Sequence, residues 1–321
     1  MSFLKCKNTM FMKIDIGGVG LILKQRFESK ELKMFRALNS RMSLLEKDRN
    51  YYLNLEKGFV GELGFDLLVE ALPTENYLVI HDFIYEISNT VFQIDTIILS
   101  GNTIYIFEVK NFEGDFYIEK DAWYSGTSDN EVKNPLLQTQ RCETLFRRLL
   151  KELGFVGTIK SYLIFINLEF HLYHAPRNSQ MIFPTQLSRF LNGFRNNPTS
   201  ITKQDQNISK KLLSIYLTES PYSRIPKYTY DQLKKGIYCP KCYSFFQRSL
   251  HCSNCGYKED LPTAVDRQVR EYNLLFPEEK ITTNVIYDWC GGLRPERTIR
   301  AVLLKSFKVN GYGKSRFYTI E

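Results

Sequence analysis

Two neighbouring segments of the sequence place acidic residues inside strongly apolar stretches. Residues 91–99 and 103–110 are rich in isoleucine, valine and phenylalanine, and Gly101-Asn102 lies between them. A Gly-Asn pair favours a two-residue hairpin loop, so we expect two antiparallel strands. In the register that this loop sets, Asp95 lies directly opposite Glu108, with Cβ atoms roughly 5 Å apart on one face of the sheet.

Opposed carboxylates of this kind are suited to holding a divalent cation. Two facing carboxylates repel each other, and a cation between them removes that cost. Mg²⁺ binds one or two carboxylates together with waters and substrate phosphate, polarises a phosphoryl oxygen and lowers the pKa of bound water. We therefore expect Asp95 and Glu108 to bind Mg²⁺ or Mn²⁺. The alternative is an exposed strand pair with scattered charges.

A lysine on the same strand completes the expected chemistry. Lys110 follows Glu108 by two residues, so both side chains lie on one face, where Gln93 is expected opposite Lys110. A lysine in this position can hold an attacking water or stabilise the negative charge of a phosphorane. These residue types at this spacing are suited to metal-assisted attack of water on a phosphoryl group.

Two predicted helices place a polar side chain toward these strands. Glu62 shares a helical stripe with apolar residues, where a metal would be a suitable partner. A helix-edge carboxylate near Lys57 is the alternative. Asn134-Pro135 opens a second helix, and Gln138 in its first turn begins the stripe that faces the sheet. Gln138 could bind phosphate or a metal water, or could be structural.

The elements that must position these side chains alternate along the chain. We expect helical structure from about Ser29 to Leu72, interrupted by glycines, and then three strands between residues 77 and 110. A helix to about Leu153 and a strand at 160–167 follow, and a looser polar stretch starts near Thr199. This succession predicts an α/β fold with a mixed sheet flanked by helices.

Four short motifs follow one another along the chain: Gly61-Glu62, Gln93-Ile94-Asp95, Phe107-Glu108-Val109-Lys110-Asn111 and Asn134-Pro135-x-x-Gln138. In this order they resemble the nuclease-related domain (NERD), a family of the PD-(D/E)XK nuclease superfamily. The resemblance covers roughly residues 50–170 and implies a nuclease-like core. It also implies site roles: metal ligands Asp95 and Glu108, catalytic lysine Lys110, and supporting residues Glu62 and Gln138. The first strand departs from the Pro-Asp of the superfamily's motif, because no proline adjoins Asp95.

Four of the seven cysteines form two Cys-x-x-Cys pairs, Cys239 with Cys242 and Cys252 with Cys255. In a reducing cytosol such pairs are typical metal ligands, and four thiolates make a closed, structural Zn²⁺ site. A redox pair is the alternative. We therefore expect a zinc ribbon in a cytoplasmic protein that has no signal peptide and no membrane segment.

The C-terminal part of the chain carries most of the positive charge. Residues 221–321 hold 17 Lys or Arg against 10 Asp or Glu, within a net charge of +8 for the chain. Three predicted helices and a basic strand resemble a winged helix, in which a helix enters the major groove and the wing contacts the backbone. The residues expected to bind nucleic acid are Arg297, Arg300, Lys305, Lys314 and Arg316. A charged protein-docking domain is the alternative.

These features predict a metal-dependent nuclease-like protein that processes DNA and is brought to DNA by its basic C-terminal module. The expected domains are an N-terminal helical extension (1–50), a NERD domain (51–225), a zinc ribbon (236–260) and a winged-helix-like domain (262–321). A non-catalytic DNA-binding or regulatory protein on the same fold is the alternative from another class. A nuclease acting on RNA is a third possibility.

Overall fold

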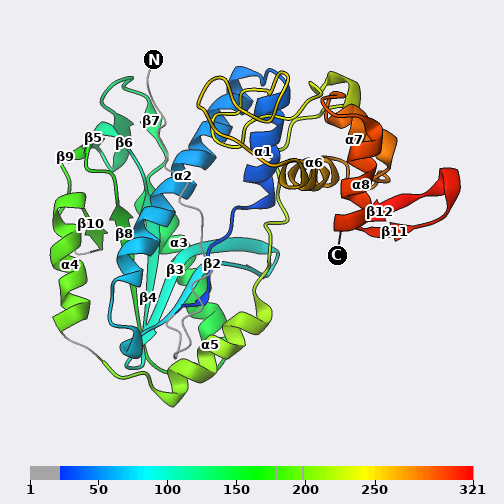
Figure 1. Ribbon diagram of the computed structural model, residues 1–321. Helices are drawn as coiled ribbons and strands as arrows, with labels where there is room; N and C mark the ends of the chain where they lie inside the picture. Colours follow the sequence, from blue (N-terminus) through cyan, green and yellow to red (C-terminus); the bar gives the residue numbers. More distant parts are fainter. Residues whose placement is uncertain (1–21, 178–179, 197–198, 321) are drawn as a thin grey trace. The chain divides into compact units, whose positions relative to one another are not determined.

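The computed structural model describes residues 22–177, 180–196 and 199–320, which fall into two compact units (Figure 1). The first, here called the sheet unit, comprises residues 22–28 and 53–222. The second, here called the cysteine unit, comprises residues 29–52 and 223–320. Each unit is therefore built from two separate stretches of the chain.

A six-stranded mixed sheet forms the centre of the sheet unit, in the order β1-β2-β3-β4-β8-β10 (Figure 1). The pairs β2–β3 and β3–β4 are antiparallel, whereas β1–β2, β4–β8 and β8–β10 are parallel. The strands span Ile22–Lys24, Leu78–Ile87, Thr90–Ser100, Thr103–Lys110, Thr158–Phe165 and Met181–Ile182. The α/β architecture expected from the sequence, a mixed sheet flanked by helices, is confirmed.

The β3–β4 hairpin has the loop and the register that the sequence predicts. Gly101 and Asn102 both have positive φ, +59° and +60°, as a two-residue hairpin turn of this kind requires. Ser100 pairs with Thr103, and the pairing continues in step as far as Thr96 opposite Phe107.

Helices pack on both faces of this sheet. On one face α2 (Glu46–Glu70) and α4 (Pro184–Asn196) share a core with Val79, Ile98 and Phe107. On the other face α3 (Pro135–Glu152) and α5 (Lys203–Ile215) share a core with Ile97 and Ile106. Neighbouring residues of β3 thus point to opposite faces, as the two-residue period of a strand requires.

A smaller sheet lies between β4 and α3 in the sequence and is completed by a later strand. Its order is β7-β6-β5-β9, with bounds Glu131–Val132, Ala122–Ser125, Gly114–Glu119 and Phe170–Tyr173. Trp123 and Phe170 from this sheet are buried against Leu163 and Phe165 of β8. The insertion is therefore packed onto the main sheet.

The cysteine unit has one hydrophobic core shared by its helices, its cysteine-rich segment and one of its two strands. Its helices are α1 (Lys30–Arg41), α6 (Leu261–Leu275), α7 (Thr283–Trp289) and α8 (Glu296–Ser306). Strands β11 (Lys308–Asn310) and β12 (Phe317–Thr319) form an antiparallel pair. Leu38 of α1, Cys252, Val269 and Trp289 are all buried in the same cluster. The cysteine-rich segment and the C-terminal helices thus stabilise each other.

Several sequence-based expectations differ from this arrangement. Residues 29–50 of the expected N-terminal extension pack with the C-terminal segments, while β1 belongs to the sheet unit; residues 1–21 lie outside the described part. Three glycines do not interrupt α2, because packing against the sheet offsets their weak helix propensity. The stretch expected to be loose after Thr199 contains α5, which begins with a capping box between Thr202 and Asp205.

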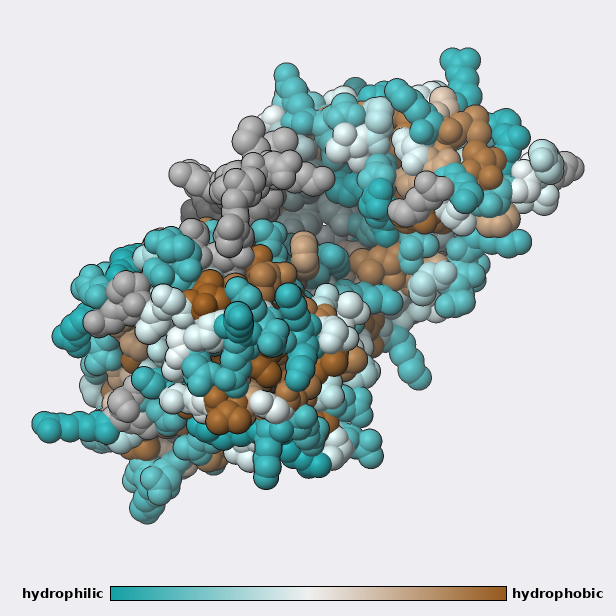
Figure 2. Space-filling view, turned by 90° about the horizontal axis from the view of Figure 1, so that it is seen from below, coloured by the Kyte–Doolittle hydropathy of each residue, from teal (hydrophilic) through white to brown (hydrophobic). Residues whose placement is uncertain are grey.

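Across the part of the chain that the structure describes, no helix is long and apolar enough to cross a membrane. Figure 2 shows one face of the molecule, on which hydrophilic side chains surround separate patches of hydrophobic ones.

Candidate functional site

The candidate site lies where β3 and β4 stop pairing. Moving away from the hairpin loop, the last paired residues are Thr96 and Phe107. Asp95 and Glu108 are the next residues on the two strands. The Asp95 carboxylate accepts a hydrogen bond from the backbone N–H of Val109, with Oδ2 at 2.8 Å from the nitrogen. The two carboxylates are thus neighbours across the strands, although the expected Asp95–Glu108 ladder pair itself is absent.

Glu108, Lys110 and Gln138 form a closed set of contacts. The Lys110 ammonium lies 2.7 Å from Glu108 Oε1 and donates to Gln138 Oε1 at 3.2 Å. Gln138 donates through Nε2 to the same Glu108 oxygen. Asn134 caps the helix and Pro135 occupies its first turn, so this helix start places Gln138 against the strand. The structure brings together these three residues as the sequence predicts.

Burial changes the acidity of this cluster. Asp95 and Glu108 are only 6% and 5% exposed. Burial and the neighbouring Asp95 raise the pKa of Glu108 to about 7, against the opposing effect of Lys110. Burial also raises the pKa of Asp95. Although burial lowers the pKa of Lys110, Glu108 and Asp95 more than offset this and keep the ammonium protonated.

Glu62 approaches from helix α2. Burial and Asp95 raise the pKa of Glu62 to about 8, which indicates that its carboxylate is close to the other acids. Its partner is Arg26, with Nη1 2.7 Å from Oε2, whereas Lys57 pairs with Glu113. The ion-pair partner of Glu62 is therefore Arg26 and not the nearby Lys57.

A glycine seats α2 against the end of β4. A Cβ atom at Gly61 would lie 2.5 Å from the Cβ of Asn111, so only glycine permits this approach. Asn111 donates through Nδ2 to the carbonyl of Lys57 at 2.8 Å, which ties the helix to the strand end. The Gly61-Glu62 motif thus combines close packing with the placement of an acid.

Four residues near this cluster, Arg26, Asp66, His81 and Asp82, were not predicted from the sequence. Arg26 binds Asp66 and Glu62, and His81 contacts Asp66 with Nδ1 2.9 Å from Oδ1. Asp82 lies within β2 with φ +54°, a left-handed conformation that costs free energy in a non-glycine residue. These contacts join residues far apart in the sequence, and their only sequence signal is charge within apolar stretches.

Gln93 does not lie opposite Lys110 as expected. It pairs with Ile84 of β2, its side chain is exposed, and it donates to Asp82 Oδ1 at 2.8 Å. The β3–β4 ladder has already ended at this level, so the predicted register does not extend to it.

The donor set of the carboxylate cluster fits a hard divalent cation. Asp95 and Glu108 are buried and Glu62 is partly buried, and the raised pKa of each reflects burial first and then neighbouring acids, which nearby cations offset only in part. Mg²⁺ needs only one or two protein carboxylates because waters and substrate phosphate complete its shell. Asp95 and Glu108 would be the ligands.

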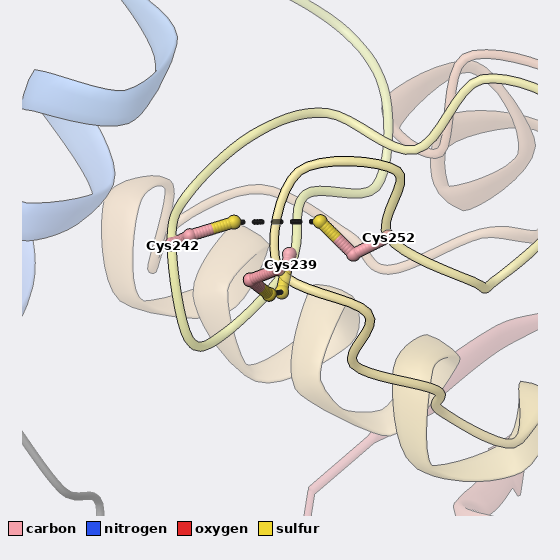
Figure 3. Close-up of side chains that lie close together, drawn as sticks. Cys239, Cys242 and Cys252 are labelled. Carbon is pink, nitrogen blue, oxygen red and sulfur yellow. Dashed lines mark hydrogen bonds between the residues drawn. The ribbon is translucent and has the colours of Figure 1, made fainter. Parts of the chain in front are cut away.

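The four cysteines form a second candidate metal centre. The sulfur atoms of Cys239, Cys242, Cys252 and Cys255 all lie within 4.8 Å of one another. Figure 3 shows the Cys242 and Cys252 sulfurs pointing toward each other, 3.4 Å apart. Tetrahedral Zn–S bonds of about 2.3 Å place sulfurs about 3.8 Å apart. This cluster is compatible with a structural zinc.

The residue after each Cys-x-x-Cys pair has the left-handed conformation that closes such a turn. Gly256 has φ +74° and Tyr243 has φ +60°. The N–H groups of these two residues donate to the carbonyls of Cys252 and Cys239, respectively. The cysteine pairs are therefore two similar knuckles.

The basic residues expected to bind nucleic acid lie in the C-terminal segments of the cysteine unit. Arg297, Arg300 and Lys305 are exposed on α8, whereas Ile299 and Leu303 of this helix are buried. Arg316 is partly buried beside β12, and the side chain of Lys314 lies outside the described part.

Residues 57–166 match the family model of the nuclease-related domain. The matched segment contains five predicted site residues: Glu62, Asp95, Glu108, Lys110 and Gln138. No curated protein and no solved structure matches the chain. The resemblance to this family is thus confirmed for the segment that carries the carboxylate cluster, and the match suggests a nuclease-related function.

Proposed function

We propose that the sheet unit, which carries the nuclease-related segment, is a metal-dependent nuclease that hydrolyses phosphodiester bonds in DNA. The observation that carries the proposal is the group formed by the buried Asp95 and Glu108 and the partly buried Lys110 at the point where β3 and β4 stop pairing. We infer that this unit is a PD-(D/E)XK nuclease-like core.

Each residue of the group has a role in this proposal. Asp95 and Glu108 hold Mg²⁺ or Mn²⁺, which when bound polarises a phosphoryl oxygen and makes its water more acidic. The Lys110 ammonium orients the attacking water and stabilises negative charge on the phosphoryl oxygens. Gln138 fixes Lys110 and Glu108 through its amide, and Glu62 supports the site from α2.

We infer that the cysteine unit holds the DNA. Exposed Arg297, Arg300 and Lys305 on α8 suit the major groove, and the β11–β12 pair with Lys314 and Arg316 suits the phosphate backbone. In this interpretation α6 to β12 form a winged-helix-like domain, and the four cysteines form a zinc ribbon that stabilises it.

Two observations favour a non-catalytic DNA-binding protein as the second candidate. Lys110 and Gln138 both bind Oε1 of Glu108, so side chains of the protein itself already partner this carboxylate. Moreover, the ligand atoms of the four cysteines all lie within 4.8 Å of one another, whereas the carboxylate cluster forms no such group of three among the described residues.

Cleavage assays decide between these candidates. Supercoiled, linear, branched and single-stranded DNA, and single-stranded RNA, are incubated with Mg²⁺ or Mn²⁺ and either wild type or Glu108→Gln. We expect wild type to cleave DNA and the variant to lose about 100-fold or more in rate, with DNA affinity retained. The matched control is Glu169→Gln, whose exposed side chain lies in the same unit.

Each outcome has a defined meaning. Cleavage by Glu108→Gln at the wild-type rate would reject the site. A wild type that binds DNA but cleaves none of the substrates would support the non-catalytic candidate. Preferential cleavage of RNA would change the assigned substrate.

A further inference from the structure

Arg26 lies outside the segment matched to the nuclease-related domain, yet its side chain reaches the carboxylate cluster. It follows β1, which pairs in parallel with β2 and so brings this residue alongside the sheet. Its side chain is only 1% exposed. A buried guanidinium requires acceptors for its N–H groups, and here these come from two different elements.

The guanidinium bridges α2 and β3. Nη1 lies 2.7 Å from Glu62 Oε2, and Nε and Nη2 lie 2.8 and 3.2 Å from the two carboxylate oxygens of Asp66. Nη2 also donates to the backbone carbonyl of Asp95 at 2.6 Å. One cation thus holds the supporting acid of the helix and the backbone of a proposed metal ligand at the same time.

We propose that Arg26 is a positioning residue, which fixes Glu62 and the Asp95 backbone so that the carboxylates face a divalent cation. The inference rests on the proposed nuclease function and extends the site to a segment outside the family match. A side chain that is 1% exposed has no surface to offer to DNA, so Arg26 acts through the residues that it binds.

In this proposal Asp66 affects the stability of the fold and does not itself position a metal ligand. Both carboxylate oxygens of Asp66 bind Arg26. Its Oδ1 also lies close to His81 and accepts a hydrogen bond from the Thr96 hydroxyl. Removing Arg26 alone leaves Asp66 as a buried charge without its guanidinium, which costs stability. Removing the charge of Asp66 as well relieves that cost but leaves Glu62 and the Asp95 carbonyl without their donor.

The double variant Arg26→Met/Asp66→Asn therefore separates positioning from stability. It keeps the net charge of the sheet unit unchanged, so any loss of cation affinity reflects geometry rather than overall charge. The matched control is Arg148→Met/Glu152→Gln on α3, an exposed ion pair with side chains 57% and 54% exposed. Both variants remove one arginine and one acid.

Three quantities are measured on the full chain: the melting temperature, kcat and KM for DNA cleavage, and Mn²⁺ affinity by titration. We expect the double variant to melt within a few degrees of wild type and to keep KM within about twofold. Its kcat and its Mn²⁺ affinity should each fall by about 10- to 100-fold, as for other groups that orient metal ligands. Arg26→Met alone should melt lower, and the control should match wild type.

A double variant that retains wild-type kcat and Mn²⁺ affinity would overturn the inference, while loss of cleavage in Glu108→Gln would still support the proposed function. A wild type that neither cleaves DNA nor binds Mn²⁺ would overturn the proposed function and this inference together.

Discussion

At the scale of single residues, the sheet unit places acids where a folded protein rarely keeps them. Asp95 and Glu108 are nearly fully buried, with Glu62 beside them, and the cations Arg26 and Lys110 balance part of their charge. Burial without full neutralisation favours the protonated carboxyl, which raises the pKa. Such a cluster costs stability, and that cost is typical of functional sites.

This cost predicts how stability depends on pH when no Mg²⁺ or Mn²⁺ is added. Burial raises the pKa of Glu62 to about 8 and that of Glu108 to about 7 in the folded protein, from 4.5. Between pH 5 and 8 the unfolded chain has already released protons that the folded protein retains, so the free energy of unfolding falls as pH rises. Urea unfolding at several pH values measures this slope.

Glu108→Gln should flatten that slope, since it removes one of the titrating groups. It should stabilise the protein at pH 8 by about 1–3 kcal/mol relative to wild type, with little difference at pH 5. The control Glu169→Gln should leave the slope unchanged. Parallel curves for wild type and Glu108→Gln would contradict the buried-carboxylate interpretation.

The sequence identifies some of these residues and not others, for a physical reason. Asp95, Glu108 and Lys110 belong to one hairpin, so strand periodicity and a two-residue loop bring them together. Arg26 and Asp82 depend on a parallel β1–β2 pairing and on a local left-handed residue. Neither feature leaves a periodic pattern in one sequence.

At the scale of elements, α2 reaches the site through close packing at one glycine. Three glycines occur in this helix, and each would ordinarily weaken it by about 1 kcal/mol relative to alanine. At Gly61 a side chain would collide with Asn111, whereas at Gly64 the nearest atom to a Cβ, in Ile166, is 3.7 Å away. The two positions therefore need glycine to different degrees.

Gly61→Ala and Gly64→Ala should have opposite effects on stability. Gly61→Ala forces α2 and Asn111 apart, and we expect it to lower the free energy of unfolding by about 1–3 kcal/mol and to reduce cleavage. Gly64→Ala should raise that free energy by about 0.5–1 kcal/mol through helix propensity. Urea unfolding of both variants tests this, and destabilisation by both in equal measure would contradict it.

Helix α5 shows the limit of prediction from local patterns. Its sequence is largely polar, but Ile208 and Leu212 pack on the sheet, and Asp205 accepts a hydrogen bond from the backbone N–H of Asn102. This contact ties the helix start to the β3–β4 loop. Because the stabilising partners lie about 100 residues earlier in the chain, the local composition alone suggests a loop.

At the scale of the whole molecule, the cysteine knuckles belong to a larger core than a separate zinc ribbon would have. The guanidinium of Arg41 in α1 lies 3.8 Å from the ring centre of Trp289 and forms an ion pair with Glu271 of α6. Glu271 in turn accepts a hydrogen bond from Tyr238, which adjoins the first cysteine pair. The knuckles are therefore linked to α1, α6 and α7.

Cys252→Ser should consequently loosen the whole cysteine unit and not only residues 236–260. We expect about one zinc per wild-type chain, a loss of most of it in the variant, and faster hydrogen exchange in α1 and α6 to α8, because zinc binding contributes directly to folding. Exchange in β3 and β4 should stay slow. Cys142→Ser, outside the cluster, is the control. Wild-type protein purified without chelators and found to lack zinc would reject the prediction.

The proposed DNA contacts are best tested by substitution, because deleting residues 262–321 would remove most of the shared core. Binding through phosphates weakens with salt, with a slope in log K against log salt of about −0.9 per contact. We expect a slope of about −3 to −4 for wild type and a slope flatter by about 2 for Arg297→Gln/Arg300→Gln.

The control for this titration is Lys203→Gln/Lys210→Gln on α5, which removes the same charge from the sheet unit. Its slope should match wild type. Equal slopes for wild type and Arg297→Gln/Arg300→Gln would indicate that α8 docks to a protein instead.

The division of each unit between two stretches of the chain has a consequence for synthesis on the ribosome. Helix α1 is made early, but most of the residues that share a core with its Leu38 come after residue 223, once the second stretch of the sheet unit, residues 53–222, has been made. At about 5–20 residues per second, this interval lasts roughly ten to thirty seconds. During that time the apolar face of α1 lacks its final partners, so the nascent chain offers a binding site for chaperones that the finished protein does not.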